Sequence, residues 1–116
     1  MEARQYILEG HEPRAVDVAT FARWWAEHPG PKRAVAQETL PDGRWLSTVF
    51  LGFDHRLGAG PPLLFETMLF QSEHDLTESY CRRYATWDEA AAGHRRVRAR
   101  VLEGRDPSED EDEDDG

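Results

Sequence analysis

Apolar residues recur with helical spacing in two parts of the chain. In the first part, Asp17 is suited to cap a helix that runs to about His28, where a Pro-Gly-Pro sequence ends the pattern. Four apolar residues at i, i+3, i+4 and i+7 are expected on its buried side: Val18, Phe21, Ala22 and Trp25. Trp24 lies at the edge of that stripe, and we expect it to be an exposed aromatic side chain.

The second helical pattern lies near the C-terminal end. Thr86 is followed three residues later by Glu89, which is the arrangement of a capping box at the start of a helix. The pattern predicts a helix from Trp87 to about Glu103. Its inward side is expected to carry Trp87, Ala90, His94, Val97 and Val101.

Segments with strand character fill the region between the two helices, and one short strand precedes them. The candidate strands are residues 6–8, 33–40, 44–53, 63–70 and 78–85. Pro41-Asp42-Gly43 predicts a hairpin turn, because Pro sets the first turn dihedral and Gly accepts the left-handed position. A polar loop is expected between Gln71 and Thr77.

Together these elements predict an α+β fold, in which two helices pack on an antiparallel sheet of four to five strands. Residues 44–53 and 63–70 are apolar at both parities, which is typical of strands covered on both faces. Either one helix covers each face, or part of the sheet is buried against a second copy of the chain. We expect a homodimer.

Composition limits the chain to one domain and places its net charge at one end. A chain of 116 residues has room for a single modest core. Residues 106–116 hold 8 of the 23 acidic residues and no base, so residues 1–105 carry 15 acidic and 14 basic side chains. We therefore expect a nearly neutral domain over residues 1–105 and a disordered acidic tail over residues 106–116.

The sequence also indicates a cellular compartment. It contains no run of 18 apolar residues, and its first residues, MEARQYILEG, lack the features of a signal peptide. We expect a cytoplasmic protein without membrane contact. The single Cys81 has no partner for a disulfide or a CxxC zinc site, and we interpret it as a small apolar strand residue.

Four segments resemble a family of small uncharacterised proteins encoded by bacteriophages and prophages. They are YILEGHEP (residues 6–13), LSTVFLGFDH (46–55), GPPLLFETMLF (60–70) and RYATWDEAAAGH (83–94), and the resemblance covers most of residues 6–101. This chain departs from the family in its longer segment between Phe70 and Arg83 and in its acidic tail. The resemblance implies a phage or prophage setting, hence the host-cell cytoplasm, and it carries over no catalytic residues.

Asp54 and His55 end the strand over residues 44–53 and precede a Gly-rich loop. A His beside a carboxylate is suited to act as a base or a metal ligand. Adjacent strand residues point to opposite faces, however, so the pair needs a bend to act on one ion. We favour the alternative that Asp54 accepts hydrogen bonds from backbone amides of the loop.

Glu66 lies among apolar residues on one side of its strand, where a carboxylate must pair or change its pKa. One explanation is a cross-strand ion pair with Arg82 or Arg83. The other is a pair with His94, at the centre of the second helix's apolar stripe. For His94 itself we favour a hydrogen-bonded core histidine over a functional role.

A small metal-assisted or acid/base hydrolase would require Asp54, His55, Glu66 and His94 to converge. No HxxH, HExxH or CxxC spacing ties any two candidate ligands together. Nucleophile chemistry has weaker support still, because Ser47 lies within a strand and Cys81 has no assigned base. We therefore expect no metal and no cofactor.

The second helix carries a cationic surface directly before seven consecutive acids. Its residues are Arg95, Arg96, Arg98 and Arg100, with Arg105 just beyond. This surface could bind nucleic-acid phosphates, or its own tail could screen it. The tail could instead mimic nucleic-acid charge and inhibit a basic partner. A simple solvated helix is the favoured interpretation.

Two classes of function remain. The first is a phage-type protein that binds a host or phage macromolecule, most simply a protein, through its sheet, through exposed aromatics such as Trp24, or through its charged C-terminal region. The second is the small hydrolase. We prefer the first, because catalysis requires four residues to converge, whereas binding requires only surfaces already inferred.

Overall fold

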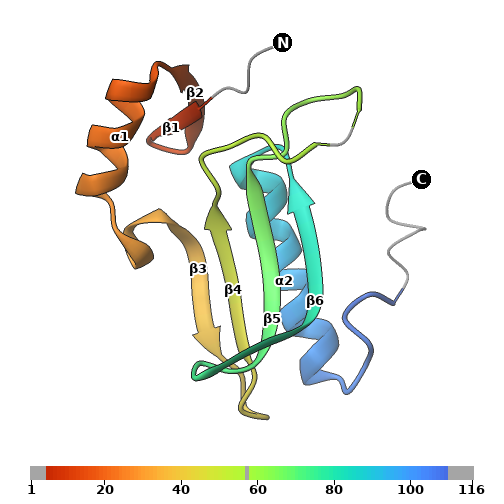
Figure 1. The fold of residues 1–116 in the computed structure, drawn as a ribbon. Helices are drawn as coiled ribbons and strands as arrows, with labels where there is room; N and C mark the ends of the chain where they lie inside the picture. The colour runs from red at the N-terminus through yellow and green to blue at the C-terminus, as the bar shows by residue number, and fades with distance from the viewer. Residues whose placement is uncertain (1–4, 57, 110–116) are drawn as a thin grey trace.

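The chain forms two antiparallel sheets and two α-helices over the residues that the computed structural model describes, which are 5–56 and 58–109 (Figure 1). In chain order the elements are β1 (Gln5–Glu9), β2 (Glu12–Val16), α1 (Val18–Glu27), the 3-10 helix η1 (Gly30–Arg33), β3 (Ala34–Thr39), β4 (Trp45–Phe50), β5 (Phe65–Ser72), β6 (Asp75–Tyr84) and α2 (Trp87–Leu102). The predicted α+β class is confirmed. None of the helices in this part of the chain is both long and apolar enough to span a bilayer.

The larger sheet has four antiparallel strands in the order β3-β4-β5-β6, so each strand pairs with its neighbour in sequence. In Figure 1, α2 runs behind this sheet and crosses it. The side chains of Leu46, Phe50, Phe65 and Leu69 alternate toward α2, and all four are at most 2% exposed. They meet Ala90 and Val97 of α2, which are also fully buried. The main core therefore lies between the sheet and this one helix.

Local sequence signals located most of these elements. The turn at Pro41-Asp42-Gly43 joins β3 to β4, with Gly43 at φ +94°. Both hydrogen bonds of the capping box at the start of α2 are present, one to the side chain of Thr86 and one to the side chain of Glu89.

The polar loop expected between Gln71 and Thr77 is wrong in its bounds. Strand β5 continues to Ser72, whose hydroxyl accepts hydrogen bonds from the amides of His74 and Asp75, and β6 begins at Asp75.

The N-terminal hairpin and α1 pack at one end of the large sheet. Strand β2 was not predicted, because its sequence EPRAV lacks apolar alternation. It pairs with β1 through a turn at Gly10. The backbone amide of Tyr6 donates to the carbonyl of Gly52, which joins the hairpin to the end of β4. A side chain at Gly52 would lie 2.7 Å from the Trp25 ring, so the missing side chain admits α1 here.

The inward side of α1 differs from the predicted stripe. Phe21 is buried, but Val18 is 66% exposed and Ala22 is also exposed. The helix contacts the hairpin and the rim of the sheet through the rings of Phe21, Trp24 and Trp25. Because α1 contacts the end of the sheet and not its face, it buries only a narrow row of aromatic side chains. A helix packed on the face of a sheet would bury a wider apolar stripe.

Only one face of the large sheet is covered by the described residues. The other, which we call the open face, faces the viewer in Figure 1. Its side chains come from alternate positions of β4, β5 and β6: Trp45, Val49, Glu66, Met68, Phe70, Cys81 and Arg83. No described helix packs there, because α1 lies at the end of the sheet. The expectation that a second copy covers this face remains a prediction.

Candidate functional site

A chain of hydrogen bonds crosses the core between the large sheet and α2. The Nδ1 atom of His94 lies 2.8 Å from the hydroxyl of Thr48 on β4. That hydroxyl lies 2.6 Å from the hydroxyl of Thr67 on β5. Both threonines are 0% exposed and His94 is 4% exposed. His94 can therefore occupy the predicted core position because polar side chains on two central strands supply its hydrogen bonds.

The other end of this series of hydrogen bonds reaches the edge strand β3. The Nε2 atom of His94 lies 2.8 Å from a carboxylate oxygen of Glu38, and Nε of Arg98 donates to the second oxygen at 2.9 Å. Partial burial raises the pKa of Glu38, but the hydrogen bonds from His94 and Arg98 outweigh it and hold that pKa below its usual value. Because a carboxylate only accepts, Nε2 carries the hydrogen, and in the neutral ring Nδ1 accepts from Thr48.

This order of hydroxyl, imidazole and carboxylate is also that of a nucleophile triad. A nucleophile must reach its substrate, however, and the Thr48 hydroxyl lies beneath α2 with no exposed surface. Its second neighbour is another buried hydroxyl rather than a cavity. We therefore assign the network to structure: it gives the buried hydroxyls of Thr48 and Thr67 hydrogen-bond partners beneath α2.

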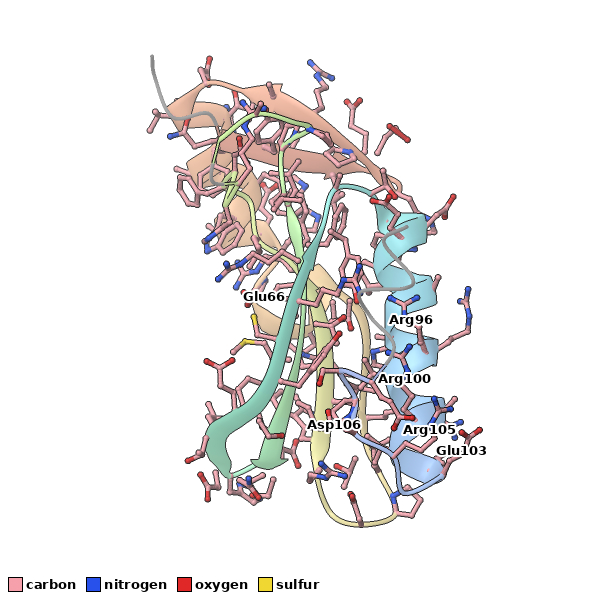
Figure 2. All side chains as sticks on the ribbon, turned by 90° about the vertical axis from the view of Figure 1, so that its right-hand side faces the viewer. Glu66, Arg96, Arg100, Glu103, Arg105 and Asp106 are labelled. Atoms are coloured by element: carbon pink, nitrogen blue, oxygen red, sulfur yellow. The ribbon has the colours of Figure 1, made fainter. Side chains whose placement is uncertain are left out.

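Glu66 lies on the open face, away from His94. Figure 2 shows Glu66 on the side of the sheet opposite α2. Its carboxylate accepts from Nε of Arg83 at 2.9 Å, and its side chain is 12% exposed. Of the three candidate partners, Arg83 is thus the one bound, as the register that pairs Glu66 with Arg83 requires. The thiol of Cys81 also lies 3.5 Å from this carboxylate.

The environment of Cys81 makes it a weak nucleophile. Burial of the thiol, together with the charge of Glu66, raises the pKa of Cys81 to about 11. The reactive thiolate is therefore scarce at neutral pH. The pair of Glu66 and Cys81 accordingly offers no activated thiol.

Asp54 organises the loop that follows β4. One of its carboxylate oxygens accepts from the backbone amides of Arg56 and Leu63, at 2.9 and 3.0 Å. The other oxygen pairs with the Arg56 side chain at 2.7 Å. Burial opposes these bonds, yet they lower the pKa of Asp54. His55 is exposed beside it and shares none of these contacts. The favoured loop-forming interpretation matches this geometry.

The four residues of the hydrolase hypothesis are thus distributed over three places. Asp54 and His55 lie in a loop, Glu66 on the open face, and His94 in the core on the other side of the sheet. Within residues 5–56 and 58–109, no group of three His, Cys, Asp or Glu side chains is arranged to hold a metal ion. No catalytic centre is assembled from these four residues.

The partner-binding candidates on α2 separate in the same way. Arg95 is exposed, Arg96 is partly buried and Arg98 is bound to Glu38. Arg100 is buried, with 6% of its surface exposed, and donates to the carbonyl of Pro107 at 3.0 Å. Its expected place on a cationic surface is therefore corrected: the chain folds back over it beyond α2.

Trp24 is also less accessible than expected. It is half-buried, its ring stacks on His28 with centroids 4.2 Å apart, and it packs nearly perpendicular to the ring of Phe50 with centroids 5.7 Å apart. The ring joins α1 to the end of the core. Trp24 is therefore unsuited to serve as a freely exposed binding anchor.

One concave site was missed by the sequence reasoning. A pocket of about 420 Å³ lies between β6, the start of α2 and the loop before β5. Its lining includes three arginines, Arg82, Arg83 and Arg96, and one carboxylate, Glu89. We call it the arginine pocket. The sequence treated Arg82 and Arg83 only as partners of Glu66, because nothing in it shows that β6 passes beside Arg96.

Comparison of the chain with protein-family models, with curated proteins and with solved structures found no match. The interpretation of the open face and of the arginine pocket therefore rests on their own geometry.

Proposed function

We propose that this protein acts by binding another protein through the open face, without catalysis. The observation that carries the proposal is a sheet with a complete core on one side and partly exposed apolar side chains on the other. Trp45 and Phe70 are a cross-strand pair, and Val49 and Met68 lie on the same face of β4 and β5, opposite Glu66 and Ser47 respectively. Apolar area of this kind, gathered on one face, is typical of an interaction surface.

The chemistry of the open face favours a protein over a nucleic acid. Its central charges, Glu66 and Arg83, neutralise each other. A nucleic-acid surface would need an excess of positive charge. The rings of Trp45 and Phe70 stack with centroids 5.6 Å apart, and aromatic side chains are enriched among the residues that contribute most to protein interfaces. The partner surface should be apolar and uncharged at its centre.

The resemblance to phage and prophage proteins suggests where such a partner would be found. In that setting the partner is a host or phage protein, and the meeting place is the host cytoplasm. The hydrolase alternative receives no support from the distribution of its four residues, and we do not propose it.

The test compares capture by the wild-type chain with capture by two lysine variants. Met68→Lys places a charge at the centre of the open face, whereas Val18→Lys alters a 66% exposed position on α1. Proteins retained from a host extract are identified, purified and measured against each variant. We expect Met68→Lys to weaken binding about thirtyfold, the effect of losing roughly 2 kcal/mol at the centre of an interface, and Val18→Lys to leave it unchanged.

Two outcomes would contradict this proposal. One is a purified partner that binds Met68→Lys as well as it binds the wild-type chain. The other is a chain that dimerises alone in sedimentation experiments and loses its dimer on Met68→Lys, since the homodimer expected from the sequence would then occupy the open face in place of another protein.

A further inference from the structure

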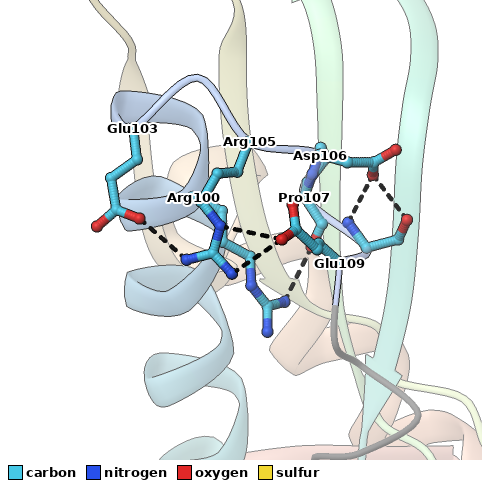
Figure 3. Close-up of polar contacts among 7 residues, drawn as sticks. Arg100, Glu103, Arg105, Asp106, Pro107 and Glu109 are labelled. Carbon is cyan, nitrogen blue, oxygen red and sulfur yellow. Dashed lines mark hydrogen bonds and ion pairs between the residues drawn. The ribbon is translucent and has the colours of Figure 1, made fainter.

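The arginines at the C-terminal end of α2 have partners within the chain, as Figure 3 shows. The guanidinium of Arg100 donates to the carbonyl of Pro107 at 3.0 Å. The guanidinium of Arg105 pairs with the carboxylates of Glu103 and Glu109. Arginines held in this way stabilise the fold and are poorly suited to bind a ligand.

Arg33 is placed differently, because its contacts are with neutral groups. Gly30, at φ +48°, is the first residue of η1, and Arg33 is the last, directly before β3. The guanidinium of Arg33 lies over the ring of Trp25, 3.6 Å from the ring centroid. One of its N–H groups donates to the backbone carbonyl of Trp25 at 3.4 Å. Neither the ring nor the carbonyl carries a charge that neutralises the guanidinium.

The positive charge of Arg33 has no counter-charge within residues 5–56 and 58–109. No carboxylate in these ranges pairs with it. Burial lowers the pKa of Arg33, and no acid among these residues acts to raise it. Stacking on an indole ring stabilises a partly buried cation, but it does not replace the missing anion. An anion that reached this guanidinium would therefore be strongly attracted.

The guanidinium of Arg33 lines a pocket of about 300 Å³, which we call the Arg33 pocket. Gln37 is its other polar side chain, and the Gln37 amide nitrogen donates to the hydroxyl of Ser47 at 2.9 Å. The rest of the lining is apolar or backbone: Trp25, Gly30, Val49, Phe50 and Leu51. The pocket thus combines one cation with an apolar wall, and its volume is at the lower end of the range for ligand sites.

We propose that the Arg33 pocket binds a carboxylate group carried on a small apolar body. The N–H groups of a guanidinium form a planar fork that matches the two oxygens of a carboxylate. Because the ring of Trp25 already fixes the plane of this fork, binding costs little side-chain freedom. The apolar body would lie against Val49 and Leu51. A nucleic-acid backbone fits less well, since it requires several cations and gains nothing from an apolar wall.

The Arg33 pocket shares Val49 with the open face but is a separate site. Two sources can present the required chemistry: a free small acid, or the C-terminal carboxylate of a protein chain whose last residue is apolar. The inference does not depend on a partner for the open face, because a free acid tests it on the chain alone.

The first test compares an acid with its neutral amide on the full-length wild-type chain. The probes are 3-phenylpropionate and 3-phenylpropionamide, which share the same apolar body. Binding is followed by NMR through the Nε–H signal of Arg33 and the indole N–H signal of Trp25. We expect the acid to shift both signals and the amide to bind at least about tenfold more weakly, the loss of one charge-assisted contact. Equal binding of acid and amide, or unshifted signals with the acid, would overturn the proposal.

A pair of variants on η1 then separates a specific contact from general attraction. Arg33→Gln and Lys32→Gln each remove one positive charge, but Lys32 is exposed and does not line the pocket. Arg33→Gln should weaken binding of 3-phenylpropionate about tenfold, and Lys32→Gln should change it less than about twofold. Equal losses from the two variants would refute the site. The comparison of acid and amide on the wild-type chain stands even where Arg33→Gln fails to fold.

Two further probes define the ligand class and its source. Phenyl phosphate carries a different anion on the same ring, and tighter binding of phenyl phosphate than of 3-phenylpropionate would overturn the assignment to a carboxylate. The dipeptide N-acetyl-alanyl-phenylalanine presents the carboxylate as a chain terminus. Tighter binding of the dipeptide than of 3-phenylpropionate supports a protein terminus as the ligand, whereas the reverse order supports a free small acid.

Discussion

The two faces of the four-stranded sheet carry similar mixtures of rings, aliphatic groups and polar groups, but they use them differently. On the face beneath α2, the polar groups of Thr48, Thr67 and His94 bind one another and are fully enclosed. On the open face, Glu66 binds Arg83, and the Arg83 side chain remains 41% exposed. The covered face thus depends on its hydrogen bonds for stability, whereas the open face tolerates change and is available for binding.

The difference between the two faces is tested most directly by replacing one polar residue on each face with leucine. His94→Leu leaves the buried Thr48 hydroxyl and Glu38 without their shared partner, which should lower the free energy of unfolding by about 3 kcal/mol. Glu66→Leu removes a partly exposed ion pair and should cost less than about 1 kcal/mol. Urea denaturation measures both. Similar losses for the two variants would show that the faces are energetically alike.

The spacing between α2 and the sheet provides the next test. Gly93 of α2 faces Tyr84 so closely that an added Cβ would lie 2.1 Å from the phenolic oxygen. Gly93→Ala should therefore destabilise the fold by about 2 kcal/mol, even though alanine favours a helix by about 1 kcal/mol.

Two companion variants separate spacing from helix preference. Ala99→Gly, at an exposed position of α2, reports helix preference alone. Tyr84→Phe removes a buried hydroxyl that has no hydrogen-bond partner among the described residues, and its effect should stay within about 1 kcal/mol of zero. A stabilising Gly93→Ala would contradict the close contact.

Acid should weaken the covered face through Glu38. Its pKa is held below the ordinary value of 4.5, so its bonds to His94 and Arg98 contribute stability fully above that pH. The contribution is lost as pH falls through the lowered pKa. Glu38→Gln should therefore be less stable than the wild-type chain near neutral pH, and the two should converge in acid. Thermal unfolding from pH 7 to pH 3 checks this, and a difference that grows in acid would contradict it.

The smallest expected effect is a change in the rate at which Cys81, on the open face, is alkylated. Cys81 is the single cysteine of the chain, so alkylation by iodoacetamide reports on it alone. Glu66→Gln removes the negative charge beside the thiol, which should lower its pKa from about 11 and speed alkylation at pH 8 about threefold or more. Glu78→Gln, a weaker influence on the same thiol, is the control. If Glu66→Gln is alkylated at the same rate as the wild-type chain, the charge of Glu66 does not influence the Cys81 thiol and the prediction is wrong.

Short-range signals in the sequence were enough to predict much of the fold. The capping box of Thr86 and Glu89 and the turn at Gly43 act within a few residues, so their patterns can be recognised without tertiary information. Strand β2 has no such signal, because Glu12, Pro13 and Arg14 become a strand only by pairing with β1. Its formation depends on a partner strand rather than on its own propensities.

The candidate sites depended more strongly on tertiary structure. His94 was predicted to be a core residue from helical spacing, but Glu38, its partner 56 positions away, carries no local signal. Arg100 matched the pattern of a solvated helix and is buried only because the chain returns over it. The choice among Arg82, Arg83 and His94 as partner of Glu66 required the register of β5 and β6, which the sequence pattern does not determine.

The position of His94 also bears on how the chain folds as it is synthesised. Its partners Thr48 and Glu38 leave the ribosome well before it does, and α2 is the last helix among the residues that the structure describes. Until α2 arrives, the four strands have neither face covered, and apolar strands in that state are prone to aggregate. Docking of α2 brings distant residues together, so it is expected to be a slow, late step. Variants that delay it should show their largest effect on the yield of folded protein in the cell.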